Sequence, residues 1–100
     1  MRLMSLFMLF FIISISSSVM GLVGHTNSMY PTFTGGELVE LIPSDTAEIG
    51  DIVVFYDEKG AVMHRVWAKW YGCYITKGDN NWVPDLGCQK IEYQVDSDDL

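Results

Sequence analysis

The chain has 100 residues, which limits it to a single domain. Its net charge at pH 7 is −7, from 13 acidic and 6 basic side chains. Nucleic-acid binding favours an excess of basic side chains, so the composition argues against nucleic acid as a partner. It also disfavours docking on anionic lipid surfaces. We interpret the acidity itself as a means of keeping a small domain soluble.

The N-terminal segment is apolar, and residues 3–23 contain neither a charged residue nor a proline. As a helix this span would be about 31 Å long, which is enough to cross a bilayer core. Residues 6–13 form an unbroken apolar run that four serines at residues 14–18 then dilute, as in a cleavable signal peptide. The residues alone therefore leave two possibilities open for residues 1–23, a transmembrane anchor or a signal peptide. In both, Arg2 biases the N-terminus toward the inside, and residues 24–100 are expected on the outer face.

Residues 24–100 have the pattern of short β-strands, and no amphipathic helix is predicted among them. Residues 24–36 are rich in turn-forming residues, and β-type runs follow at residues 37–42, 52–56, 61–70, 71–76 and 90–95. Residues 57–60 and 78–81 have the composition of tight turns. This spacing predicts a mainly β domain, barrel-like or sandwich-like, after one N-terminal transmembrane helix.

Two cysteines, Cys73 and Cys88, allow a single pairing. In an oxidising compartment a disulfide across the 14 intervening residues would stabilise the fold by about 3 kcal/mol in the chain-entropy model. In a reducing compartment both would be buried thiols. The spacing contains no C-x-x-C pair and no Cys/His metal cluster, so we predict neither a metal site nor a cofactor.

Ser28 lies just after the apolar segment, and His64 lies on the apolar face of its predicted strand. Ser28 is a candidate nucleophile, although a serine beside a proline-containing turn is also common in ordinary loops. His64 is a candidate general base, because burial would keep its ring neutral, as a general base requires. His25, three residues before Ser28, is a weaker candidate base because a glycine-rich loop positions it loosely. Asp79 and Asp85 lie in turns, where each could cap its own backbone or orient a histidine.

Four short blocks follow one another along the chain. Residues 28–32 read S-M-Y-P-T, residues 50–55 read G-D-I-V-V-F, residues 64–66 read H-R-V and residues 76–81 read T-K-G-D-N-N. Together they resemble signal peptidase I of the ER and archaeal type, in the family's order and over about residues 22–87. The histidine of the third block marks this subtype, because bacterial relatives carry a lysine base there. Asp85 stands at the spacing of the family's second acidic residue after the fourth block.

The resemblance implies a membrane-anchored serine endopeptidase that removes signal peptides from exported preproteins on the extracytoplasmic or ER-lumenal face. Ser28 would be the nucleophile, His64 the general base, and Asp79 or Asp85 the residue that orients His64. The Ser28 N–H would hold the oxyanion, and Thr26 is a candidate second donor because a hydroxyl assists at this position in bacterial relatives.

The resemblance also implies how a substrate would bind. The preprotein would lie extended along a strand edge, in shallow pockets for small side chains. The membrane, through one N-terminal span, and accessory membrane subunits are the further partners expected. A family member would use residues 3–23 as an anchor, so the resemblance favours the anchor over a signal peptide.

The chain departs from the family pattern in two places. Family members often read S-G-S-M at the nucleophile, whereas residues 26–29 read T-N-S-M. Asparagine tolerates the left-handed backbone that a glycine would supply, so the same turn is expected. Only a short stretch follows the fourth block, where ER-type members continue further. The alternative to an enzyme is therefore a catalytically silent, membrane-anchored β-domain that acts as an accessory or binding subunit.

Overall fold

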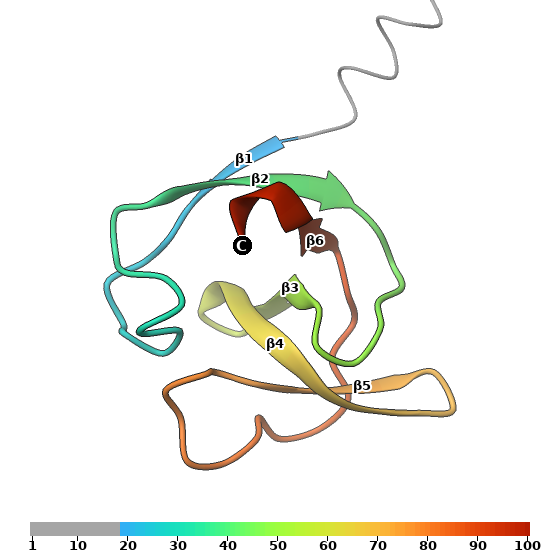
Figure 1. Ribbon diagram of the computed structural model, residues 1–100. Helices are drawn as coiled ribbons and strands as arrows, with labels where there is room; N and C mark the ends of the chain where they lie inside the picture. Colours follow the sequence, from blue (N-terminus) through green and yellow to red (C-terminus); the bar gives the residue numbers. More distant parts are fainter. Residues whose placement is uncertain (1–18) are drawn as a thin grey trace, which may run out of the picture.

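The computed structural model describes residues 19–100, which form one antiparallel sheet of six strands (Figure 1). The elements are β1 (Val19–Leu22), β2 (Leu38–Pro43), β3 (Ile52–Asp57), β4 (Gly60–Trp70), β5 (Cys73–Lys77), β6 (Tyr93–Val95) and a 3₁₀ helix, η1 (Ser97–Asp99). The strands lie in the order β1-β2-β6-β3-β4-β5. The prediction of a mainly β domain is confirmed.

The predicted strands agree best with the structure where turn-forming residues lie at their ends. Strands β2, β3 and β4 lie within one residue of the predicted limits, and the predicted turn joins β3 to β4, where Asp57 pairs with Gly60. The run predicted at 71–76 begins later, because Tyr71 and Gly72 form a turn with positive φ. The run predicted at 90–95 pairs as a strand only at Tyr93–Val95, where it lies between β2 and β3.

The predicted membrane anchor over residues 1–23 falls mostly outside the described residues. Its last part does not: Val19–Leu22 form β1 and pair with β2, from Val19 opposite Leu41 to Leu22 opposite Leu38. Within residues 19–100, no helix has the length and apolar character to span a membrane. The sheet therefore begins inside the segment that was assigned to the anchor, and the anchor itself stays a prediction.

Strand β3 lies at the centre of the fold and is buried on both faces. Successive side chains of a strand point to opposite faces, so Ile52 and Val54 pack into one apolar cluster and Val53 and Phe55 into another. Figure 1 shows β1 and β2 on one side of β3, and β4 with β5 on the other. The unbroken apolar run of residues 52–55 therefore reflects burial on both faces, not a half-exposed strand.

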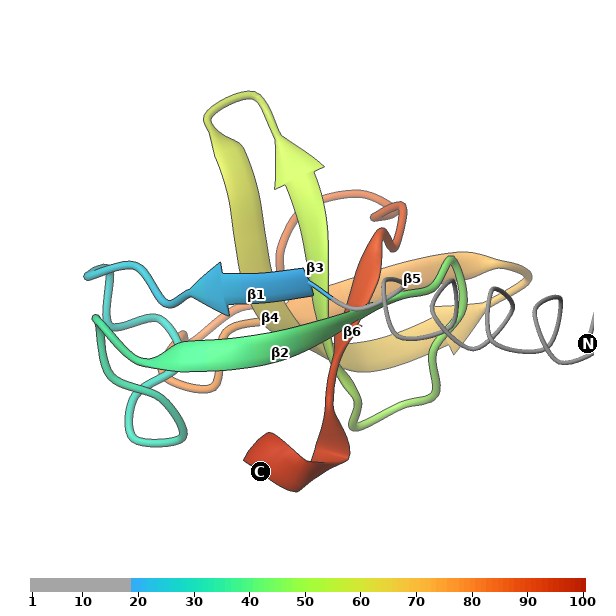
Figure 2. The same cartoon turned by 90° about the horizontal axis from the view of Figure 1, so that it is seen from above.

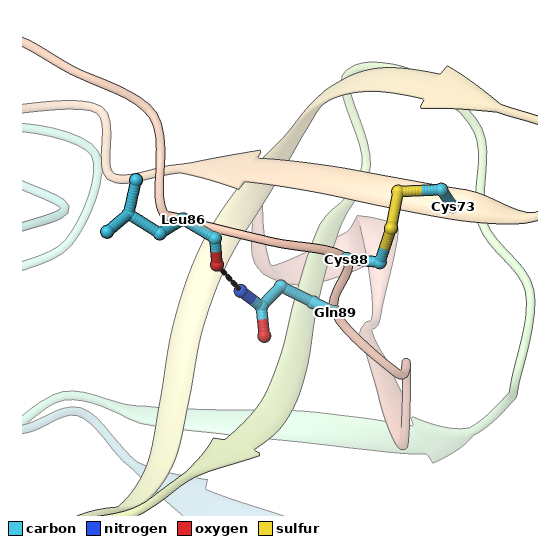
Figure 3. The surroundings of a disulfide bond; sticks show 4 residues. All are labelled: Cys73, Leu86, Cys88 and Gln89. Atoms are coloured by element: carbon cyan, nitrogen blue, oxygen red, sulfur yellow. Dashed lines mark hydrogen bonds between the residues drawn. A yellow bond between two sulfur atoms is a disulfide. The ribbon is translucent and has the colours of Figure 1, made fainter.

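Cys73 and Cys88 form a disulfide, so the oxidised alternative is the one observed (Figure 3). Their Cα atoms lie 5.0 Å apart. The bridge joins the start of β5 to the C-terminal part of the irregular segment of residues 78–89, which we call the β5–β6 loop. Two backbone hydrogen bonds also hold this loop along β5, from Gln89 N to the Tyr74 carbonyl and from Asp85 N to the Thr76 carbonyl. The loop is thus fixed to β5 at three points near its C-terminal end.

Candidate active site

Ser28 lies in the loop between β1 and β2, and the core holds that loop in place. Met29 and Phe33 are only 3% and 4% exposed and belong to the same apolar cluster as Ile52 and Val54. Asn27 has a φ of 61°, so the left-handed turn expected before the nucleophile box is confirmed. Figure 2 shows this loop beyond the end of β1, at one end of the sheet. Its serine is therefore presented from a fixed backbone.

The turn at residues 78–81 packs directly against the Ser28 loop. Asn80 N donates to the Ser28 carbonyl at 2.8 Å, and Asn80 Nδ2 donates to the Asn27 carbonyl at 3.0 Å. A Cβ atom on Gly78 would lie 2.7 Å from the Ser28 carbonyl oxygen, so only glycine fits there. These contacts join two segments far apart in the sequence and fix the backbone on both sides of the serine.

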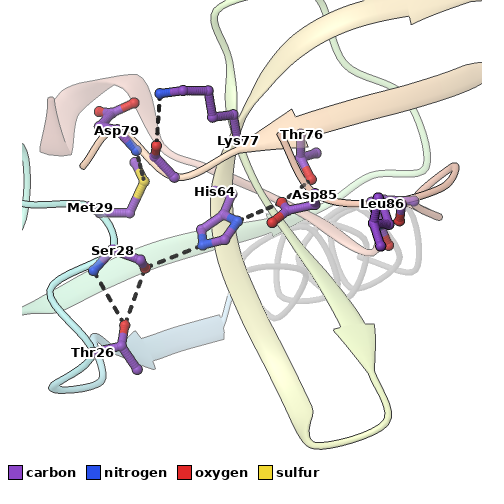
Figure 4. Close-up of polar contacts among 11 residues, drawn as sticks. Thr26, Ser28, Met29, His64, Thr76, Lys77, Asp79, Asp85 and Leu86 are labelled. Atoms are coloured by element: carbon purple, nitrogen blue, oxygen red, sulfur yellow. Dashed lines mark hydrogen bonds and ion pairs between the residues drawn. The ribbon is translucent and has the colours of Figure 1, made fainter. Parts of the chain in front are cut away.

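The side chains of Ser28, His64 and Asp85 form a continuous chain of contacts (Figure 4). His64 Nε2 lies 3.2 Å from Ser28 Oγ, and His64 Nδ1 lies 2.6 Å from Asp85 Oδ2. His64 is 7% exposed, opposite Val53 in the sheet and edge-on to the Phe55 ring. The structure therefore brings these three sequence-predicted residues together at the end of the buried core.

Asp79, the other candidate partner of the histidine, lies elsewhere and faces Arg65. Its two carboxylate oxygens accept from Arg65 Nε and Nη2, each at 2.9 Å, and Oδ2 also accepts from Thr32 Oγ1 at 2.6 Å. The hydrogen bonds from Arg65 hold the pKa of Asp79 below its usual value, although partial burial opposes that shift. The same pair raises the pKa of Arg65. Asp79 thus ties β4 to the loop that follows Ser28.

Thr26, the candidate second oxyanion donor, lies against the serine. Thr26 Oγ1 donates to Ser28 Oγ at 3.1 Å and accepts from Ser28 N at 3.4 Å. His25 is exposed and packs against Gly35, away from the Ser28–His64–Asp85 contacts. Of the two histidines in the chain, only His64 contacts the serine.

Residue types alone did not single out two further side chains around the site. Thr76 is fully buried and its hydroxyl donates to Asp85 Oδ2 at 2.6 Å. Asn80 holds the serine loop as described above. Both lie in the T-K-G-D-N-N block, which is the only signal in the sequence that could have pointed to them.

A groove of about 640 Å³ opens beside Ser28 and His64. Its walls come from β1 and β2, from the β3–β4 hairpin and from the β5–β6 loop, and they are mostly apolar, including Leu22, Phe55, Val62, Met63 and Leu86. Asp57, His64 and Asp85 are its ionisable lining residues. Within residues 19–100, no three His, Cys, Asp or Glu side chains are grouped so that they could hold a metal ion.

This arrangement can activate a hydroxyl. A neutral imidazole can take the Ser28 proton at Nε2, while a carboxylate at Nδ1 holds the ring in the required tautomer. The groove can keep a ligand beside the hydroxyl and partly away from water. Nucleophilic attack on an electrophilic carbon placed above Ser28 is the chemistry that this geometry allows.

Comparison with known proteins points to one enzyme family. The chain is 39% identical over 71 residues to the signal peptidase complex catalytic subunit SEC11 of Debaryomyces hansenii, covering 62% of this chain and 42% of that protein. It is 38% identical over 85 residues to the signal peptidase complex catalytic subunit SEC11 of Scheffersomyces stipitis, covering 75% of this chain and 51% of that protein. These matches support a relationship to the signal peptidases.

The matched relatives are longer than this chain, which spans about half of their length. No protein-family model matches the chain, and no solved structure matches it significantly. The similarity therefore supports a signal peptidase, and so a protease, in general terms.

Proposed function

We propose that this chain is a membrane-anchored serine endopeptidase that removes signal peptides from exported preproteins. The observation that carries the proposal is the contact chain from Ser28 Oγ through His64 to Asp85, with links of 3.2 and 2.6 Å. It occurs beside an apolar groove, in a chain similar to catalytic subunits of the signal peptidase complex. The contact chain and the sequence similarity together support the proposal better than either does alone.

Ser28 is the nucleophile in this proposal and His64 is the general base. Ser28 Oγ attacks the carbonyl carbon of the scissile bond while His64 Nε2 takes the hydroxyl proton. Asp85 orients the ring through Nδ1 and stabilises the imidazolium that forms. The imidazolium then protonates the leaving amine. Water, activated by the same ring, hydrolyses the acyl ester and restores the Ser28 hydroxyl.

The oxyanion is held by the Ser28 N–H together with the Thr26 hydroxyl. One well-placed donor of this kind contributes about 2.7–4 kcal/mol to transition-state stabilisation. In the free enzyme the Thr26 hydroxyl donates to Ser28 Oγ. A hydroxyl proton rotates freely about its C–O bond, so it can turn toward the oxyanion as negative charge develops there.

The preprotein lies extended in the groove, beside the free edge of β1. Within residues 19–100, strand β1 pairs with β2 alone, so among these residues its other edge leaves backbone groups available to an added strand. The apolar lining suits the apolar and small side chains around a signal-peptide cleavage site. We assign this groove to the residues that precede the cut.

Asp79 has a supporting role in this proposal. Its carboxylate is committed to Arg65 and Thr32, so it holds the Ser28 loop against β4 and does not take part in proton transfer. Asp85 alone orients His64.

The enzyme is placed on the extracytoplasmic or ER-lumenal face of a membrane, held by a single N-terminal span. The disulfide supports this side of the membrane, because such bonds persist in oxidising compartments. Accessory membrane subunits are proposed as partners, since the similar proteins are subunits of a complex. An anchor also raises the effective concentration of a membrane-bound substrate around the groove.

The test uses the full chain reconstituted in lipid vesicles with a model preprotein, and the product masses locate the cut. We expect one cleavage, directly after the small residue that ends the signal peptide. A second preprotein with leucine at that position should resist cleavage, because the groove must fit a small side chain there. Cleavage of both alike would contradict the assignment of substrate. Binding of the preprotein with no cleavage would instead favour the silent accessory domain.

A further inference from the structure

Thr76 is a buried polar residue that has no role in the proposed proton transfer. It lies near the C-terminal end of β5 with no exposed surface, and its hydroxyl donates to Asp85 Oδ2 at 2.6 Å. A buried hydroxyl without a partner is costly, so this hydrogen bond is needed for the hydroxyl to be buried at all. Threonine is also stiff at χ1, so the direction of the hydroxyl is set by the strand.

Thr76 and His64 reach the same carboxylate oxygen from neighbouring strands. Thr76 is paired with Val66, two residues along β4 from His64, so the two side chains are diagonal neighbours on one face of the sheet. Thr76 Oγ1 donates to Asp85 Oδ2 at 2.6 Å, and His64 Nδ1 lies at the same distance from that oxygen. Two fixed strands thus define one position for that oxygen.

Asp85 itself comes from an irregular loop and has no strand to orient it. The Asp85 N–H donates to the Thr76 carbonyl at 2.8 Å, so Thr76 holds this residue by its backbone as well as by its side chain. Without the hydroxyl, the described contacts of the carboxylate would be reduced to His64 alone. The ring and the carboxylate could then rotate together away from Ser28.

We propose that Thr76 is a positioning residue for the Ser28–His64–Asp85 set: it fixes the Asp85 carboxylate, and through it the tautomer and direction of the His64 ring. This inference rests on the proposed function for its effect on cleavage. It concerns a residue that never contacts substrate and acts only through Asp85.

The first test compares Thr76→Val with Thr76→Ser. Valine keeps the shape and removes the hydroxyl, and we expect kcat to fall about 10–100-fold with little change in KM, the loss typical of removing a supporting hydrogen bond one step from the reacting groups. Serine restores the hydroxyl and should recover most of the rate. Ile75→Val, on the opposite face of β5, is the matched control for a mild disturbance of the strand. Equal rates for Thr76→Val and wild type would overturn the proposal.

The second test is a double-mutant cycle with Asp85→Asn. If Thr76 acts through Asp85, adding Thr76→Val to Asp85→Asn should lower kcat much less than it does in the wild type. Full additivity of the two losses would mean that Thr76 acts on the fold in general, and would contradict the proposal.

The third test needs no cleavage, so it separates failure of this inference from failure of the proposed function. In a Ser28→Ala background, the His64 Nδ1 proton that bonds Asp85 should give a downfield NMR signal. We expect that signal to broaden or shift upfield in Thr76→Val and to return in Thr76→Ser. An unchanged signal in Thr76→Val would overturn the positioning role even if the enzyme cuts preproteins. A changed signal with no cleavage by wild type would uphold it and refute the protease.

Discussion

At the scale of single residues, the partner that faces each aspartate decides its role. Asp79 meets a guanidinium and a hydroxyl, whereas Asp85 meets an imidazole and a hydroxyl. The two residues are separated by five others in the chain and have similar turn-like surroundings in the sequence. The path of the β5–β6 loop decides which partner each aspartate meets. It places Asp79 in an ion pair that supports the fold and Asp85 against a potential base.

The first prediction is that substitution of Asp85 lowers the cleavage rate far more than substitution of Asp79. Asp85→Asn keeps the size of the side chain but can stabilise the wrong tautomer of His64, so we expect kcat to fall on the order of 10,000-fold. Asp79→Asn should keep most of its kcat at neutral pH. The rates are measured with a model preprotein in lipid at temperatures where both variants are folded. A larger loss in Asp79→Asn than in Asp85→Asn would reverse our assignment.

At the scale of elements, the β5–β6 loop links the fold to the site. It carries Asp79 near its start and Asp85 near its end, and the disulfide closes it onto β5. Cys88 is three residues after Asp85, so the bridge limits how far that carboxylate can move. Stability and chemistry are therefore coupled through this one segment.

The second prediction follows from that coupling. The double variant Cys73→Ser/Cys88→Ser should lower the free energy of unfolding by about 3 kcal/mol, because the unbridged chain gains loop entropy when unfolded. Its cleavage rate should fall as well, since Asp85 is less restrained. Urea unfolding and preprotein cleavage measure the two effects. If both values equal those of the wild type, the loop is held by its hydrogen bonds alone.

The strands that the sequence predicted well are those bounded by strong turn signals. Asp57-Glu58-Lys59-Gly60 and the Gly50-Asp51 pair set the limits of β3 and β4, so local chemistry was enough there. Strand β1 was missed because its four residues continue an apolar run, and only pairing with β2 makes them a strand. The choice between Asp79 and Asp85 could not be predicted either, since it depends on long-range contacts with Arg65 and His64.

At the scale of the whole molecule, an acidic domain of this size is sensitive to low pH. Few carboxylates in residues 19–100 are ion-paired, and hydrogen bonds from Arg65 hold the pKa of one of them, Asp79, below its usual value. A carboxyl group with a lowered pKa in the folded state stabilises the fold above its unfolded pKa of about 3.9. That contribution is lost as the pH falls through the folded pKa. Arg65 is one-third exposed, so solvent screens part of the effect.

The third prediction compares wild type with Asp79→Asn across pH. The wild type should have the larger free energy of unfolding at pH 5–7, and the difference should narrow below about pH 4 as the unfolded Asp79 becomes protonated. Urea unfolding at pH 7, 5, 4 and 3 provides the values. A difference that stays constant down to pH 3 would show that the charge of Asp79 contributes nothing to stability.

Removal of the Ser28 hydroxyl is the sharpest test of the proposal that Ser28 is the nucleophile of a signal peptidase. Wild type, Ser28→Ala and the control Ser97→Ala, which alters an exposed serine of η1, are assayed together on one preprotein in lipid. We expect cleavage by wild type and Ser97→Ala and none by Ser28→Ala, with equal thermal stability for all three. Cleavage by Ser28→Ala at the wild-type rate would contradict it.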